Sequence, residues 1–213
     1  MQHRTDHVAA SSREGFVEQE FHAGRNFAGG HAMTAMVTPS DIIAFWSEAG
    51  PGLWFAKDDG FDRRFREQFT QAHEMALRGE LEHWQRTPGG ALALILLLDQ
   101  FPRNVFRGTP RMYASDAAAL KVAEAALAAG HDRHFDADLR LFFYLPFGHS
   151  EQLAHQERSV ALCRELGGES LAHAEGHRDI IRRFGRFPHR NAILNRDMTA
   201  AELQFLDDGG FAG

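Results

Sequence analysis

An unbroken apolar run from Ala91 to Leu98 constrains the fold of this chain more than any other feature of the sequence. The helix-start signal Thr87-Pro88 precedes the run, and Pro102 follows it. A buried parallel strand is the competing interpretation, but the length through Gln100 and the Leu and Ala content favour a helix. A helix that is apolar on every side must be surrounded by other elements of the protein.

Capping residues and glycines predict further helices on both sides of this run. Thr38 is placed to cap a helix that begins at Pro39 and stops at Gly50, and Thr199 with Glu202 forms a capping box. Apolar residues at helical spacing extend the pattern between these ends. The predicted helices cover residues 38–50, 59–78, 87–100, 110–129, 137–145, 151–166 and 169–184, and a short last helix follows Thr199.

Prolines, a serine and a glycine set several of the predicted boundaries. Pro102 ends the apolar helix, and Pro146 ends the helix over 137–145, because proline disrupts a helix interior. Ser150 caps the helix over 151–166, and Gly185 stops the helix over 169–184. About eight helices with short joints and no alternating strand pattern predict an all-α fold of antiparallel pairs, a helical bundle or a solenoid.

Composition and charge narrow the class of protein. The chain has 213 residues and a formal net charge of −6, which argues against a nucleic-acid partner. No apolar run approaches the roughly 20 residues that a membrane-spanning helix needs. Residues 1–36 are polar, are not a signal peptide, and are predicted to be a disordered extension, with Met33 or Met36 as an alternative start. We expect one cytoplasmic domain over residues 37–213, with no membrane partner.

Three stretches together resemble a known family. They are Leu96-Leu97-Leu98-Asp99-Gln100-Phe101-Pro102-Arg103-Asn104, Tyr144-Leu145-Pro146-Phe147-Gly148-His149-Ser150-Glu151 and Arg183-Phe184-Gly185-Arg186-Phe187-Pro188-His189-Arg190-Asn191. In this order they are similar to the uncharacterised, mostly bacterial family called domain of unknown function 924. The resemblance covers about residues 39–206. It implies an all-helical, tetratricopeptide-like fold and implies no activity.

Arginines gather near the C-terminus of this acidic chain. Between Arg178 and Arg196 there are six arginines and one acidic residue, Asp179. Their partners are either acidic residues elsewhere in the chain, with Asp99, Glu151 and Glu157 as candidates, or an external anionic ligand held by guanidinium groups. The sequence leaves both alternatives open.

Two histidines are candidates for acid–base chemistry. His177 shares a helix face with Ile180, Ile181 and Phe184, so it is either a satisfied core residue or a pocket-lining acid or base. His149 precedes a helix start. His173 and His177 are spaced to share a metal ion, but no third ligand is evident, and neither a metal nor a cofactor is predicted.

Two hypotheses of function follow. In the first, a cleft holds a small anionic molecule, with His177 or His149 as the catalytic candidate in case the protein is an enzyme. Its ligand-binding candidates are Asp99, Arg103, Glu151, Arg186, His189 and Arg190. In the second, the protein is a tetratricopeptide-like module that binds a protein or peptide partner without catalysis. A ligand pocket requires the candidate residues in one place, whereas an interaction groove spreads them over successive helix pairs.

The first hypothesis also makes a geometric prediction. Gly185 lets the chain reverse after Phe184, so His177 should lie near residues 186–191. Asp99 should then accept a hydrogen bond from Arg186 or Arg190.

Overall fold

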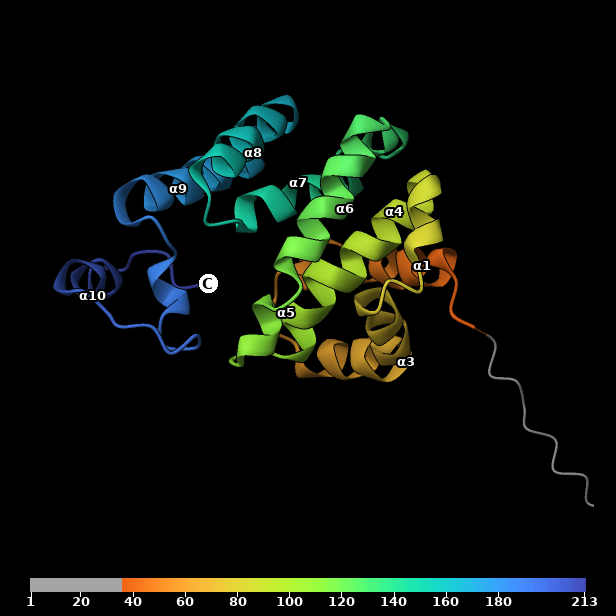
Figure 1. Cartoon of the computed structure of the whole chain (residues 1–213), viewed down its shortest axis with the longest axis horizontal. Coiled ribbons are helices and arrows are strands. Elements are labelled where there is room, and N and C mark those ends of the chain that lie inside the picture. Colours follow the sequence, from red (N-terminus) through yellow and green to blue (C-terminus); the bar gives the residue numbers. More distant parts are fainter. Residues whose placement is uncertain (1–35) are drawn as a thin grey trace, which may run out of the picture. The chain divides into compact units, whose positions relative to one another are not determined.

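The structure, a computed structural model, describes residues 36–213, and these residues form one compact unit (Figure 1). The predicted disordered extension therefore lies outside the described residues, apart from Met36. Helix is the only regular secondary structure within residues 36–213, in agreement with the all-α prediction. None of these helices is long and apolar enough to cross a bilayer.

The helices follow one another with short joints. The α-helices are α1 (Pro39–Ala49), α2 (Pro51–Trp54), α3 (Asp59–Leu77), α4 (Pro88–Ile95), α5 (Phe101–Val105), α6 (Asp116–Ala128), α7 (Ala137–His149), α8 (Leu153–Leu166), α9 (Gly168–Phe184) and α10 (Ala200–Asp207). Short 3-10 turns lie at η1 (Glu82–Arg86), η3 (Pro110–Tyr113), η4 (His131–His134) and η5 (Pro188–Arg190), and η2 (Leu96–Gln100) is a π-helical turn.

Helix α4 and the π turn after it form the centre of the main core. Every residue from Gly90 to Phe101 is buried, and α1, α6, α7 and η1 pack around α4. The apolar run is thus a surrounded helix, as predicted, and the strand alternative is wrong. Phe61 and Phe65 of α3 stack on Phe45 of α1, and Phe69 meets the same ring edge-on.

The π turn explains why Pro102 does not end the helix. The Phe101 N–H donates to the Leu96 carbonyl, five residues back, which widens the turn before the proline. Pro102 has no N–H to offer the Leu98 carbonyl, and Ser115 Oγ donates to that carbonyl instead, at 2.6 Å. The helix therefore continues to Val105, and the predicted stop at Pro102 is wrong.

Three other predicted boundaries are also wrong. α7 continues through Pro146 to His149. α6 begins at Asp116, because the residues from Pro110 to Tyr113 form a 3-10 turn. α8 begins at Leu153, and Ser150 is not its cap: Ser150 Oγ instead bonds His155 Nδ1 at 2.8 Å.

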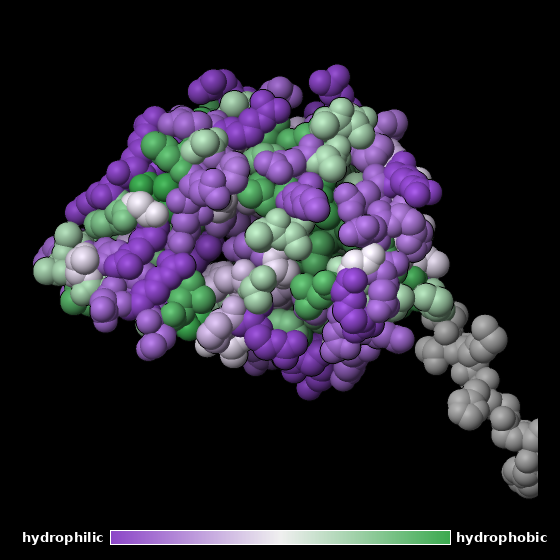
Figure 2. Space-filling model, viewed as in Figure 1, coloured by the Kyte–Doolittle hydropathy of each residue, from purple (hydrophilic) through white to green (hydrophobic). Residues whose placement is uncertain are grey.

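The C-terminal part has a small core of its own. α8 packs on α7 and on α9, and Ile180, Ile181 and Phe187 form a second buried cluster beside Phe205 of α10. The predicted capping box of Thr199 and Glu202 begins α10, and Gly185 ends α9 in a left-handed conformation, as predicted. Figure 2 shows a mostly hydrophilic face on which apolar side chains are scattered. The tetratricopeptide-like solenoid stays a prediction.

Candidate functional site

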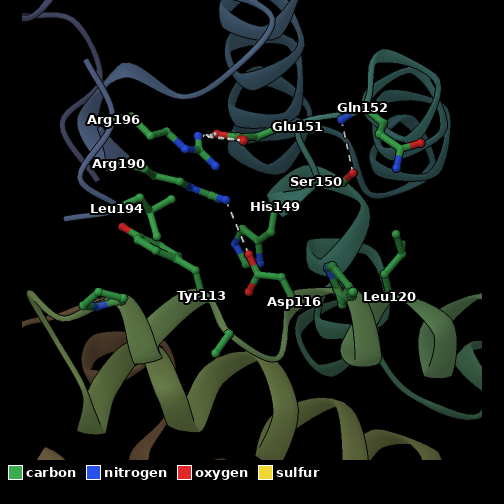
Figure 3. A pocket seen from close by; sticks show the side chains of 14 residues that line it. Tyr113, Asp116, Leu120, His149, Ser150, Glu151, Gln152, Arg190, Leu194 and Arg196 are labelled. Atoms are coloured by element: carbon green, nitrogen blue, oxygen red, sulfur yellow. Dashed lines mark hydrogen bonds and ion pairs between the residues drawn. The ribbon is translucent and has the colours of Figure 1, made fainter. Parts of the chain in front are cut away.

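A pocket of about 370 Å³ opens between the end of α7 and the segment that follows α9 (Figure 3). Three stretches that are far apart in the sequence form its walls: η3 with the start of α6, residues 146–152, and residues 190–196. Its polar lining includes Tyr113, Asp116, His149, Glu151, Arg190 and Arg196. All of these side chains can ionise, so their charge states decide what the pocket can bind.

Behind the pocket, both oxygens of the buried Asp99 carboxylate accept hydrogen bonds. Asp99 has no exposed surface, and its Oδ1 lies 2.7 Å from His149 Nδ1 and 3.2 Å from Arg103 Nη1. Gln100 Nε2 donates to Oδ2 at 2.6 Å. The π turn carries both Asp99 and Gln100, consistent with the frequent use of such turns at functional sites. The cost of burying this charge is offset by a cation and two hydrogen bonds.

The charge states of Asp99 and His149 follow from these contacts. Burial alone would raise the pKa of Asp99, but the attraction of Arg103 and the hydrogen bonds from His149 and Gln100 hold it below its ordinary value. Burial and repulsion by Arg103 lower the pKa of His149, and they outweigh the attraction of Asp99. At neutral pH the pair is therefore a carboxylate and a neutral imidazole.

In this state Nδ1 of His149 donates its proton to Asp99, and Nε2 is left as an unprotonated acceptor. Because His149 lines the pocket, that acceptor is available to a ligand. A histidine held in one tautomer by a carboxylate can accept a hydrogen bond or a proton.

Arg103 links Asp99 to the pocket wall. Its Nη1 donates to Asp116 Oδ1 at 2.8 Å and to the Asp99 carbonyl at 2.9 Å. Its Nη2 is buried and has no hydrogen-bond partner among residues 36–213. Arg103 is thus a bridging cation with one unused donor group.

Arg190 reaches the pocket from the opposite side. Only 6% of its surface is exposed, and its guanidinium group lies 4.6 Å from the ring centre of Tyr113 and 4.5 Å from that of Phe187. Its Nη1 makes a long contact of 3.4 Å with Asp116 Oδ2, whereas its buried Nε has no partner in the described part of the chain. Burial lowers the pKa of Arg190, because the charged guanidinium group is removed from water.

Glu151 ties the segment after α9 to the end of α7. Both of its carboxylate oxygens accept from Arg196 Nη1 at 2.9 Å, and Oε1 also accepts from the Phe187 N–H at 2.9 Å. Burial would raise the pKa of Glu151, but these bonds lower it below its ordinary value. Glu151 is therefore anionic at neutral pH and fixes the wall that carries Arg190.

Residues 42–210 match the family model described as "Bacterial protein of unknown function (DUF924)". The chain belongs to this family. A solved structure of a protein of unknown function from Agrobacterium tumefaciens is 53% identical, and the match covers 80% of this chain and 97% of that one, with a TM-score of 0.79. No curated protein matches the chain. The comparisons therefore establish the DUF924 family and support the fold without naming an activity.

Each stretch that carries the DUF924 resemblance supplies residues to the network around the pocket. Residues 96–104 supply Asp99 and Arg103, residues 144–151 supply His149 and Glu151, and residues 183–191 supply Arg190. The structure thus brings together most of the residues that the sequence proposes for ligand binding.

Four of the six proposed ligand-binding residues lie outside the pocket lining, and so does the catalytic candidate His177. Asp99 and Arg103 lie directly behind the lining and contact His149 and Asp116 in it. Arg186 binds Glu202 at 2.6 Å and the Asp197 carbonyl at 2.8 Å, so it anchors α10. His177 and His189 lie in an aromatic cluster with Phe211, at ring-centre distances of 4.7 and 5.1 Å. His177 does lie beside the segment over 186–191, 5.3 Å from the ring of Phe187, as the geometric prediction requires.

The predicted bond from Arg186 or Arg190 to Asp99 is wrong. Arg103, one turn along from Asp99, supplies the cation instead, because a neighbour at i+4 reaches the carboxylate without any rearrangement of the chain. The sequence also missed Asp116, which resembles an ordinary first-turn acid of α6.

Proposed function

We propose that this protein binds a small anionic molecule in the pocket between α7 and the segment over residues 190–196. One observation supports the proposal above the others. Arg190 is a buried cation with a weak internal contact and an unused Nε donor, and it lines a pocket large enough for a small metabolite.

The physical reason is the cost of burying charge. A guanidinium group loses much of its hydration when it is nine-tenths buried, and a single contact of 3.4 Å offsets little of that loss. The two flanking rings favour the cation through their π faces, but they supply no hydrogen-bond acceptor for Nε. An anionic oxygen in the pocket would give the guanidinium group a strong acceptor.

The alternative of a tetratricopeptide-like interaction module has less support. That hypothesis expects the candidate residues to be spread over successive helix pairs, whereas five of them belong to one network around one pocket. The face drawn in Figure 2 also carries no broad apolar patch of the kind that marks many protein interfaces.

Calorimetric titration with inorganic phosphate tests the proposal. We expect saturable binding to the wild-type protein, and a dissociation constant at least tenfold higher for Arg190→Gln. Arg182→Gln is the matched control. Arg182 lies on the surface of α9, where it pairs with Glu157 of α8. Its affinity should equal that of the wild type.

Circular dichroism will show whether each variant is folded. If Arg190→Gln does not fold, Arg196→Gln tests the same pocket, because Arg196 is partly exposed and lines its rim. The absence of saturable phosphate binding to the wild type, or equal affinities in wild type and folded pocket variants, would contradict the proposal.

A further inference from the structure

The charges around the pocket balance. Its lining and the layer behind it contain three guanidinium groups, from Arg103, Arg190 and Arg196, and three carboxylates, from Asp99, Asp116 and Glu151. His149, between them, is neutral at pH 7. A site built only to attract negative charge would have an excess of cations, and this site has none.

Hydrogen-bond acceptors therefore face a ligand as well as donors. Asp116 and Glu151 line the pocket as carboxylates. His149 Nδ1 is occupied by Asp99, so its Nε2 is a further acceptor. An anion that offers only oxygen lone pairs would satisfy Arg190 but would be repelled by these acceptors.

We propose that the ligand carries a hydrogen-bond donor, an O–H or N–H, beside its anionic group, and that His149 Nε2 accepts the hydrogen bond from it. Hydroxy acids, amino acids and phosphate groups that retain a proton share this chemistry. The inference rests on the proposed function, because it specifies the ligand of the same pocket. Arg190 binds the anionic group, and His149 selects for the donor.

Asp99 is a positioning residue in this arrangement. It receives Nδ1–H and so keeps Nε2 free of a proton. The other ionisable groups near His149 are Arg103, Asp116, His177 and His189. Burial and Arg103 oppose protonation of the imidazole, whereas Asp99 and Asp116 favour it, and burial has the largest effect.

A comparison of phosphate with sulfate tests whether the site prefers an anion that carries a hydrogen-bond donor. Both ions are tetrahedral and similar in size, but phosphate retains an O–H at pH 7 and sulfate does not. The wild-type protein, labelled in its histidine rings, is titrated with each ion at matched ionic strength and followed by NMR. We expect phosphate to bind at least tenfold more tightly than sulfate, because sulfate leaves the acceptors unpaired.

His149→Asn tests which residue makes this selection. The amide of asparagine can still donate to Asp99, but it places no acceptor where Nε2 was. We expect the preference for phosphate to fall to less than threefold while the affinity for sulfate is retained. Arg190→Gln is the comparison, and it should weaken the binding of both ions alike.

The outcomes separate this inference from the proposed function. Equal binding of phosphate and sulfate that still depends on Arg190 would overturn the inference and leave the anion site in place. No binding of either ion would overturn both. If His149→Asn does not fold, the phosphate-to-sulfate ratio of the wild-type protein still decides.

Discussion

Asp99 is the most enclosed charge of the site, and its removal should be costly. In Asp99→Asn, the guanidinium group of Arg103 loses its fully buried anion and keeps only the partly exposed Asp116. We expect the free energy of unfolding to fall by about 3–5 kcal/mol, as is typical when one partner of a buried ion pair is removed. Urea denaturation measures this change.

Asp179→Asn is the control for this substitution. Asp179 also contacts arginines but is exposed on α9, and its replacement should change the free energy of unfolding by less than about 0.5 kcal/mol. Equal effects of the two substitutions would show that Asp99 does not hold the network together.

The buried histidines predict how stability depends on pH. Burial, with repulsion from nearby cationic groups, lowers the pKa of His177 to about 3 and that of His189 to about 4. In the unfolded chain both pKa values return to about 6.5. Below that pH the unfolded state binds protons that the folded state does not, so stability is full above pH 6.5 and falls as the pH drops.

Between pH 6.5 and pH 5, each of these two histidines should reduce the free energy of unfolding by about 2 kcal/mol. Asp99 and Glu202, whose pKa values are lowered, act mainly below this window because unfolded carboxylates titrate near pH 4. Urea denaturation at both pH values tests the prediction. His189→Gln should remove about 2 kcal/mol of the difference, and an unchanged difference would contradict the account.

At the scale of elements, the caps at Thr38 and Thr199 were predictable from the sequence, whereas the continuation of helices through Pro102 and Pro146 was not. Thr38 and Thr199 cap helices through contacts within a few residues, so the local sequence contains the signal. Pro102 is tolerated because Ser115, from a distant turn, satisfies the carbonyl that the proline leaves free. No local pattern contains that contact.

The start of α4 offers a test of how tightly the central helix is packed. A Cβ at Gly90 would overlap the Trp84 carbonyl oxygen, whereas a Cβ at Gly89 would meet only Ile43 Cδ1, at an ordinary distance of 3.5 Å. Gly90→Ala should therefore destabilise the protein by about 2 kcal/mol or more. Gly89→Ala, one residue away, should be neutral or stabilising by up to about 1 kcal/mol.

Thermal unfolding of the two alanine variants measures this difference. A lower melting temperature for Gly90→Ala alone supports the packing around α4. Equal melting temperatures for the two variants would mean that η1 does not approach α4 as closely as described.

At the scale of the whole molecule, the site depends on three segments that are distant in the sequence. The sequence identified residues from each of them, including Asp99, His149 and Arg190, because polar side chains at helix ends and joints stand out against apolar stripes. It could not predict which charges pair, since the choice of Arg103 over Arg190 as the partner of Asp99 follows from how α5 and η5 are placed in space.

The central claim is that this pocket binds an anion through Arg190, and a crystal structure of the protein grown with inorganic phosphate tests it most directly. The account predicts a phosphate ion between Arg190 and His149, with an oxygen within hydrogen-bond distance of the Arg190 guanidinium group. A pocket that holds only water at saturating phosphate, or an ion bound away from Arg190, would contradict it.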